Sequence, residues 1–247
     1  MKFLGLVAVC VTALLAIASP AAARAEFRCN GVFKGKAYGD VVVPRGAACT
    51  LINSKVAGNV KALKGSYFQA TNTAVRGDIE GDEVQTIFVE AGSRAASIEA
   101  VKAVQFFVYN STVLEDIEPE RTKETVQICG NTVRRGNIEV RRSGPNGTAL
   151  PQHPGTDILI GDPLTEGCRG NVVKRGDIKV LRNFADIEFV IRGNTIRNGD
   201  LLVSGNTGPV QKIIDRNVGG GRLTCRENAL LTTNGSTGWD RKLGQCA

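Results

Sequence analysis

The chain has 247 residues, of which 42% are hydrophobic and 22% are charged, and its formal net charge is +7. This composition is ordinary for a folded soluble protein and excludes an intrinsically disordered chain, which would be poorer in hydrophobic residues. The positive charge is compatible with anionic glycans, lipids or nucleic acid without matching one of them, and we expect no nucleic-acid ligand.

The first 25 residues have the build of a secretory signal peptide. A charged start at Met1-Lys2 precedes the apolar run from Phe3 to Ile17, and small residues follow up to Ala23-Arg24-Ala25. The apolar run is shorter than the ~20 residues that a transmembrane helix needs. We therefore predict cleavage after residue 25, or after Ala21-Ala22-Ala23, and a secreted protein without a membrane span. Removal of residues 1–25 leaves 29 basic against 24 acidic residues, a net charge of +5.

Aliphatic residues recur at a nearly constant spacing along the rest of the chain. The first five lie 19 residues apart, and the later spacings are 21, 40, 23 and 22 residues. These nine anchor residues are Val41, Val60, Ile79, Ile98, Ile117, Ile138, Ile178, Leu201 and Leu223. A period of this length is typical of stacked repeats, because one short unit cannot bury its own apolar face.

The repeat unit reads Asn-Ser/Thr-x-Val-x-Gly-Asn/Asp-Ile/Val, most clearly in residues 53–60 and 72–79, and a second apolar run precedes each Asn. Val and Ile next to Gly-Asp or Gly-Asn turns favour short strands, and no sustained 3.6-residue period follows residue 25. We predict an all-β solenoid of about nine to ten rungs of 19–23 residues, a rung being one turn of the chain.

Six asparagines precede their anchors by seven residues. They are Asn53, Asn72, Asn110, Asn131, Asn171 and Asn194. Asparagine tolerates left-handed backbone, and its amide both donates and accepts hydrogen bonds, so stacked copies can bond along the solenoid axis. We interpret these residues as a structural ladder and not as a binding site.

The repeat resembles the right-handed parallel β-helix of the pectate-lyase-like superfold. The Val-x-Gly-Asp/Asn-Ile corner is similar to that of bactofilins, the bacterial polymer-forming β-helix proteins, over most of residues 40–225. The resemblance implies a right-handed winding and a bacterial source. It does not extend to filament formation, because bactofilins are cytosolic and carry no signal peptide.

Six cysteines follow the predicted signal peptide, and an even number in a secreted chain indicates disulfides. Cys29 and Cys49 lie 12 and 11 residues before their anchors, so they are expected on neighbouring rungs within bonding reach. Cys225 and Cys246 are expected to close a C-terminal cap at residues 225–247. A zinc site is not expected, because the chain has one histidine and no Cys-x-x-Cys pair.

Cys129 and Cys168 occupy equivalent corners, nine and ten residues before their anchors. A full extra rung between them would separate them by roughly 10 Å, which is too far for a disulfide. We therefore predict that residues 139–168 leave the stack as a loop and that these two cysteines form a disulfide.

Acidic residues recur next to the anchors, at Asp40, Asp78, Asp116, Asp177 and Asp200. Their regularity indicates turn capping, and we expect Arg76, Arg135, Arg175 and Arg197 to neutralise them. Calcium bound between adjacent aspartates is the alternative. If the protein is an enzyme, the candidate catalytic residues are His153, Asp157 and Asp162, which lie in the irregular segment 139–168 where insertions build sites.

We predict a secreted, non-enzymatic β-helix protein with a structural or binding role at the cell envelope or on an extracellular polymer such as a glycan, with no cofactor. The alternative is a lyase or hydrolase that acts on an anionic polysaccharide. End-to-end self-assembly is a third hypothesis.

Overall fold

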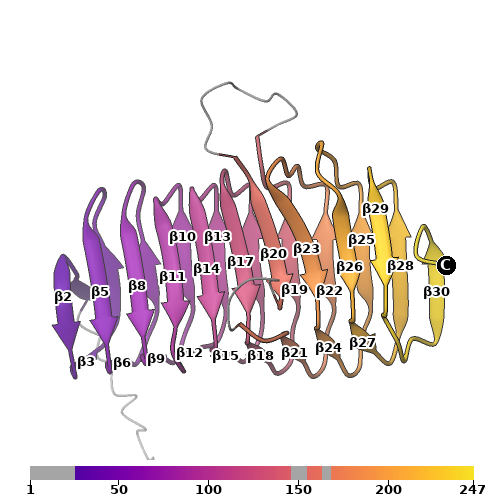
Figure 1. Ribbon diagram of the computed structural model, residues 1–247. Coiled ribbons are helices and arrows are strands. Elements are labelled where there is room, and N and C mark those ends of the chain that lie inside the picture. Colours follow the sequence, from indigo (N-terminus) through magenta and orange to yellow (C-terminus); the bar gives the residue numbers. More distant parts are fainter. Residues whose placement is uncertain (1–25, 146–154, 163–167) are drawn as a thin grey trace, which may run out of the picture.

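The computed structural model describes residues 26–145, 155–162 and 168–247, which form one parallel β-solenoid of about 11 turns without a helix (Figure 1). Each turn crosses three sheets in the same order, here named A, B and C, so that neighbours within a sheet are parallel and one turn apart. The solenoid class predicted from the repeat is confirmed. The right-handed sense of winding stays a prediction.

The strands are short and each sheet runs the length of the stack. Sheet A contains β1 (Glu26–Arg28), β4 (Asp40–Val43), β7 (Val60–Ala62), β10 (Ile79–Asp82), β13 (Ile98–Val101), β16 (Ile117–Glu120), β19 (Ile138–Arg141), β22 (Ile178–Leu181), β25 (Leu201–Ser204), β28 (Arg222–Arg226) and β30 (Arg241–Gly244). Sheet B contains β2 (Gly31–Lys34), β5 (Ala48–Ile52), β8 (Tyr67–Thr71), β11 (Thr86–Glu90), β14 (Gln105–Tyr109), β17 (Thr125–Cys129), β20 (Asp157–Gly161), β23 (Glu188–Arg192), β26 (Lys212–Asp215) and β29 (Leu231–Asn234). Sheet C contains β3 (Ala37–Tyr38), β6 (Lys55–Val56), β9 (Ala74–Val75), β12 (Arg94–Ala95), β15 (Thr112–Val113), β18 (Thr132–Val133), β21 (Val172–Val173), β24 (Thr195–Ile196) and β27 (Val218–Gly219).

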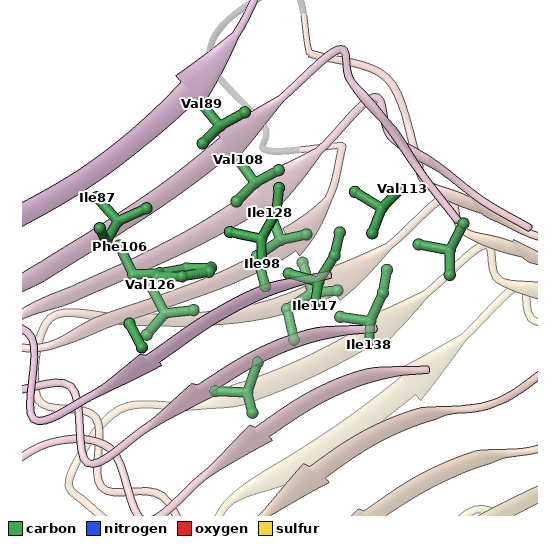
Figure 2. Packing of buried hydrophobic residues seen from close by; sticks show 14 of the residues in the cluster. Ile87, Val89, Ile98, Phe106, Val108, Val113, Ile117, Val126, Ile128 and Ile138 are labelled. Atoms are coloured by element: carbon green, nitrogen blue, oxygen red, sulfur yellow. The ribbon is translucent and has the colours of Figure 1, made fainter. Parts of the chain in front are cut away.

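The nine anchor residues form one continuous column on the inner face of sheet A. Each pairs in register with the next, and none is more than 1% exposed. Figure 2 shows Ile98, Ile117 and Ile138 in this column, facing Phe106 and Val126 of sheet B. The periodic pattern therefore identified the core correctly.

The stack is longer than the nine to ten rungs predicted. Phe27 pairs with Val41 at one end and Lys242 pairs with Leu223 at the other, which adds a rung beyond each end of the anchor series. An aromatic and a charged residue at the anchor position concealed these rungs from a search for aliphatic periodicity. At the N-terminal end the ring of Phe27 stacks on Tyr38 at 4.3 Å, so aromatic side chains cover the end of the core.

Three disulfides join the cysteine pairs expected from the repeat. The Cα atoms lie 5.5 Å apart in Cys29–Cys49, 5.7 Å apart in Cys129–Cys168 and 5.2 Å apart in Cys225–Cys246. The first two pairs join neighbouring rungs. The segment 225–247, where we expected a cap, contains β29 and β30, which continue sheets B and A.

The segment 139–168 does not leave the stack as a single loop. Its first residues belong to β19, and β20 lies in sheet B between β17 and β23. Residues 138–178 thus form one long rung, and its additional residues lie on both sides of β20. The predicted disulfide is confirmed, because Cys129 and Cys168 are on neighbouring rungs. The single-loop geometry was wrong because a strand of ordinary length remains in the stack.

The six predicted ladder asparagines separate into two columns. Asn53, Asn72 and Asn110 are exposed and have left-handed backbone, with φ of 50°, 47° and 46°. Asn131, Asn171 and Asn194 are buried and lie one position further along. The spacing of seven residues before the anchor therefore does not identify one structural position, because the turn from sheet C into sheet A has one more residue in the later rungs.

The buried asparagines form the longer hydrogen-bonded ladder, and in the exposed column Asn72 Nδ2 donates to Asn53 Oδ1 at 2.7 Å. Asn194 Oδ1 accepts from both the backbone N–H and the Nδ2 of Asn171 at 3.0 Å, and Asn194 Nδ2 donates to Ile160 O at 2.9 Å. Ser111 and Asn217 extend the column before and after the predicted residues. Each amide bonds to backbone N–H and C=O groups that water cannot reach. The ladder therefore supplies the hydrogen-bond partners for the buried backbone at this corner.

A second ladder, which the sequence analysis did not identify, lies at the corner between sheets A and B. Asn183 donates to Asn206 Oδ1 and Asn206 donates to Asn228 Oδ1, at 2.9 and 2.8 Å. Each follows its anchor by five residues, so a search in the C-terminal direction would have found this column. Two of the three corners are therefore held by buried amides in the C-terminal half.

Replacing an anchor should cost much more stability than replacing an exposed aliphatic neighbour. We expect Ile117→Ala to lower the free energy of unfolding by about 2–5 kcal/mol, because Ile117 is 0% exposed and its loss leaves a cavity. The control Leu114→Ala removes a side chain that is 41% exposed and should cost less than about 1 kcal/mol. Urea denaturation measures both, and equal losses would contradict the internal column.

The two asparagine columns should respond differently to substitution. Asn194→Ala leaves buried groups of Asn171 and Ile160 without a partner, and we expect it to cost at least about 2 kcal/mol. The control Asn53→Gly keeps the left-handed backbone at an exposed corner and should change stability by less than about 1 kcal/mol. The melting temperatures of both variants test this, and a larger loss in Asn53→Gly would reverse the assignment.

Candidate functional site

The regularly spaced aspartates hold the corner between sheets C and A. Asp40 Oδ1 accepts the N–H of Asn59 at 2.8 Å, and Asp177 Oδ1 accepts the N–H of Asp200 at 2.8 Å. The other three aspartates each accept a backbone N–H of the next rung in the same way. Asp78 accepts from Ser97, Asp116 from Asn137 and Asp200 from Arg222. Each of these carboxylates accepts a hydrogen bond from the backbone of the following rung, so their role is to stabilise the stacking of the rungs.

The arginines expected to neutralise this column do not do so. Arg76, Arg135, Arg175 and Arg197 are exposed, and none forms an ion pair within the described residues. Arg222 pairs with Asp200 at 2.7 Å and Lys179 with Asp177 at 3.4 Å. Hydrogen bonding to Arg222 lowers the pKa of Asp200 in spite of the opposing effect of burial. In the part of the chain described, no group of three or more His, Cys, Asp or Glu side chains could hold a metal ion.

The three candidate catalytic residues are not brought together where they can be located. Asp157 begins β20 and Asp162 follows its end, so the two stand at opposite ends of a five-residue strand, about 16 Å apart. The N–H of Asp162 donates to Arg192 O at 2.9 Å. His153 lies outside the described residues.

Asp157 instead has an acidic neighbour in the adjacent strand. It pairs in register with Glu188 of β23, on the outer face of sheet B. Burial and then the charge of Asp186 raise the pKa of Asp157, and burial and then the charge of Asp157 raise the pKa of Glu188. Glu188 is not apparent as a candidate from the sequence, because only the pairing of β20 with β23 makes the two carboxyl groups neighbours.

A group of aromatic side chains lies on the same outer face, in the middle of the stack. The rings of Phe88, Phe107 and Tyr109 have centroids 5.5–5.9 Å apart, and all three side chains are partly buried. They project outward because residues alternate along β11 and β14, while Ile87 and Phe106 between them point into the core. The strands were expected from the sequence, but the outward aromatic cluster was not.

Amide and hydroxyl groups surround these rings. The Tyr109 hydroxyl donates to Gln127 Oε1 at 2.7 Å, and Gln69 Nε2 donates to Glu90 Oε1 at 3.1 Å. We call the outward side chains of β8, β11, β14 and β17 the aromatic-amide surface. They are Tyr67, Gln69, Thr71, Thr86, Phe88, Glu90, Gln105, Phe107, Tyr109, Thr125 and Gln127.

The charge of the aromatic-amide surface is low. It contains one carboxylate, Glu90, and no lysine or arginine. Burial, and then the charge of Glu90, raise the pKa of Tyr109, so its hydroxyl remains protonated at all physiological pH values. Because the amides and hydroxyls each carry donors or acceptors beyond the bonds they make within the surface, they can also bond a ligand.

The aromatic-amide surface and the Asp157–Glu188 pair are continuous. The strand β17 pairs with β20, and β20 with β23, so the two features occupy consecutive parts of one sheet face. This face is the candidate functional site. It runs along the solenoid axis, across the strands, with successive rungs ~4.8 Å apart.

No family model matches the chain, and neither a curated protein nor a solved structure matches it. The assignment to the parallel β-solenoids therefore depends on the strand register, and the resemblance to pectate-lyase-like proteins and bactofilins stays a prediction. In the described part of the chain there is no helix that is both long and apolar enough to cross a membrane.

Proposed function

We propose that this protein is an extracellular, non-enzymatic binding protein for a neutral polysaccharide, which lies along the aromatic-amide surface of sheet B. The observation that carries the proposal is the set of outward aromatic rings framed by amides on neighbouring strands. Sugar rings have apolar faces and hydroxyl edges, so they fit aromatic rings bordered by donors and acceptors. The three disulfides support an oxidising, extracellular location.

The charge distribution favours a neutral polymer over the anionic polysaccharide considered from the sequence. Glu90 would repel an acidic sugar, and the aromatic-amide surface has no cation to attract one. A linear chain suits this surface because equivalent positions repeat along the axis from β8 to β17. The polymer would then lie across the strands and contact one or two side chains of each rung.

Removing an aromatic ring should weaken polysaccharide binding without unfolding the protein. We expect Phe107→Ala to reduce the affinity for a neutral insoluble glycan about tenfold, which corresponds to roughly 1.4 kcal/mol. Ile213→Ala, at an outward position of β26 beyond the aromatic-amide surface, is the matched control and should bind as the wild type does. Pull-down isotherms on several neutral glycans measure this, and the proposal fails if wild-type protein is retained on none of them.

The Asp157–Glu188 pair favours a second candidate function, glycoside hydrolysis on the same face. Two carboxyl groups with raised pKa values on neighbouring strands resemble the acid and base that hydrolases use. On the proposed binding function, wild-type protein releases no reducing sugar from a polysaccharide that it retains. If the protein is a glycoside hydrolase, it releases reducing sugar from that polysaccharide.

A conservative pair of variants separates the two functions. If the face hydrolyses its ligand, Glu188→Gln should abolish sugar release while pull-down retention stays unchanged, and Asp157→Asn should do the same. If it only binds, neither variant should change retention by more than about twofold, because both residues lie outside the aromatic-amide surface. Assays of released reducing ends across pH give the measurement.

A further inference from the structure

The outer face of sheet A carries an unpaired acidic region in its N-terminal half. Glu80, Glu99 and Glu118 stand in register on β10, β13 and β16, and Asp82 projects from the same face of β10. Within the described residues, none of these four carboxylates forms an ion pair. We call them the acidic half of sheet A.

The acidic half keeps a net negative charge that no ion pair within the described residues offsets, although Lys61 of β7 stands in register with Glu80. Burial raises the pKa values of Glu99 and Glu118, and neighbouring carboxylates, including Asp116, raise them further. Arg141 is the one cation that opposes this effect, and it already pairs with Glu120 and Glu139. Like charges one rung apart destabilise a sheet, so this face gains from cations supplied by another molecule.

The C-terminal half of the same face has the opposite charge. A shallow groove there has a volume of about 420 Å³, with arginines around the partly buried Leu181 and Leu202. Within the part of the chain described, Arg182 and Arg226 form no ion pair, whereas Arg142 pairs with Glu120. We call Arg142, Arg182 and Arg226 the basic half of sheet A.

The acidic half contains a matching groove. It has a volume of about 270 Å³ and includes Glu80, Asp82, Glu99 and one cation, Lys61. Val101 lies in its wall, and its side chain is 39% exposed. Each half therefore combines a shallow depression, an exposed or partly exposed aliphatic side chain and a net charge of one sign. The basic groove also contains one carboxylate, Glu139, beside its arginines. The two halves follow each other along the solenoid axis on a single sheet (Figure 1).

We propose that two copies of this chain pair face to face through sheet A with their solenoid axes antiparallel, so that the acidic half of each copy lies against the basic half of the other. A two-fold axis makes such an interface self-complementary, since every contact occurs twice. A parallel arrangement would bring like charges together. Electrostatic complementarity of this kind selects the partner and its orientation.

A polyanion is a poorer occupant of this face than a second copy. It would be attracted by the basic half and repelled by the acidic half, which continues on the same sheet. A ligand that pairs with both halves must place positive charge against the acidic half and negative charge against the basic half. A second copy does so when its solenoid axis runs in the opposite direction. The pairing leaves the outer face of sheet B free, so it is independent of polysaccharide binding.

Charge reversal tests the pairing. We expect the wild-type protein to sediment as a dimer at low salt and to dissociate at high salt. Glu80→Lys with Glu99→Lys places two lysines against Glu118 and Asp82 and so removes the net negative charge of the acidic half. Arg182→Glu with Arg226→Glu leaves only Arg142 as a cation and makes the basic half net acidic, so each double variant alone should be monomeric. An equimolar mixture of the two should recover the dimer, because the lysines introduced in one copy then face the glutamates introduced in the other, and the two unchanged halves still carry opposite charges.

The control reverses two exposed charges on sheet C, Lys55→Glu with Arg94→Glu, and should leave the dimer intact. Sedimentation velocity gives the masses, and circular dichroism reports whether each variant folds. A wild-type monomer at all concentrations, a dimer that survives both double variants or high salt, or folded double variants that do not combine would each overturn the proposal. Survival of an oligomer in both double variants would point to end-to-end contact.

Discussion

Parallel stacking in register is the constraint on which the rest of this structure depends. Each backbone strand bonds to the equivalent strand one turn before and one turn after, so side chains at equivalent positions lie directly above one another. A position in the repeat is thus a column, and the chemistry of a residue is judged against its copies. Apolar columns gain from this arrangement, since Val and Ile stack into a continuous core.

Polar side chains also stack in columns, and whether a column can be buried depends on the hydrogen bonds that its residues can form. An asparagine can donate to one copy and accept from the next, so Asn171 and Asn194 satisfy each other and the backbone at a buried corner. An aspartate can only accept, and it remains at the more exposed corner, where it accepts an N–H of the next rung. The amide is buried because it serves both directions along the axis.

Charged columns gain nothing from stacking, and the chain tolerates them on outer faces alone. Glu99 and Glu118 stand one rung apart, and burial, followed by repulsion from neighbouring carboxylates such as Asp116, raises their pKa values. The outer face of sheet B is different, because aromatic and amide side chains can stack without repulsion. The interior of the solenoid is mainly apolar, with Lys212 as a buried exception, and the outer faces of its sheets differ in chemistry, which is where binding surfaces can arise.

The sequence alone determined the solenoid class, the anchor column and the three disulfides, because the period of the chain fixes which residues stack. It misjudged the Asn131 column by one position and treated residues 139–168 as one loop, since insertions shift the count while the strands stay in register. It also missed Glu188 beside Asp157 and the outward rings around Phe107. Only the tertiary structure decided these, because an outer surface is assembled from neighbouring rungs whose alignment depends on backbone pairing and not on sequence distance.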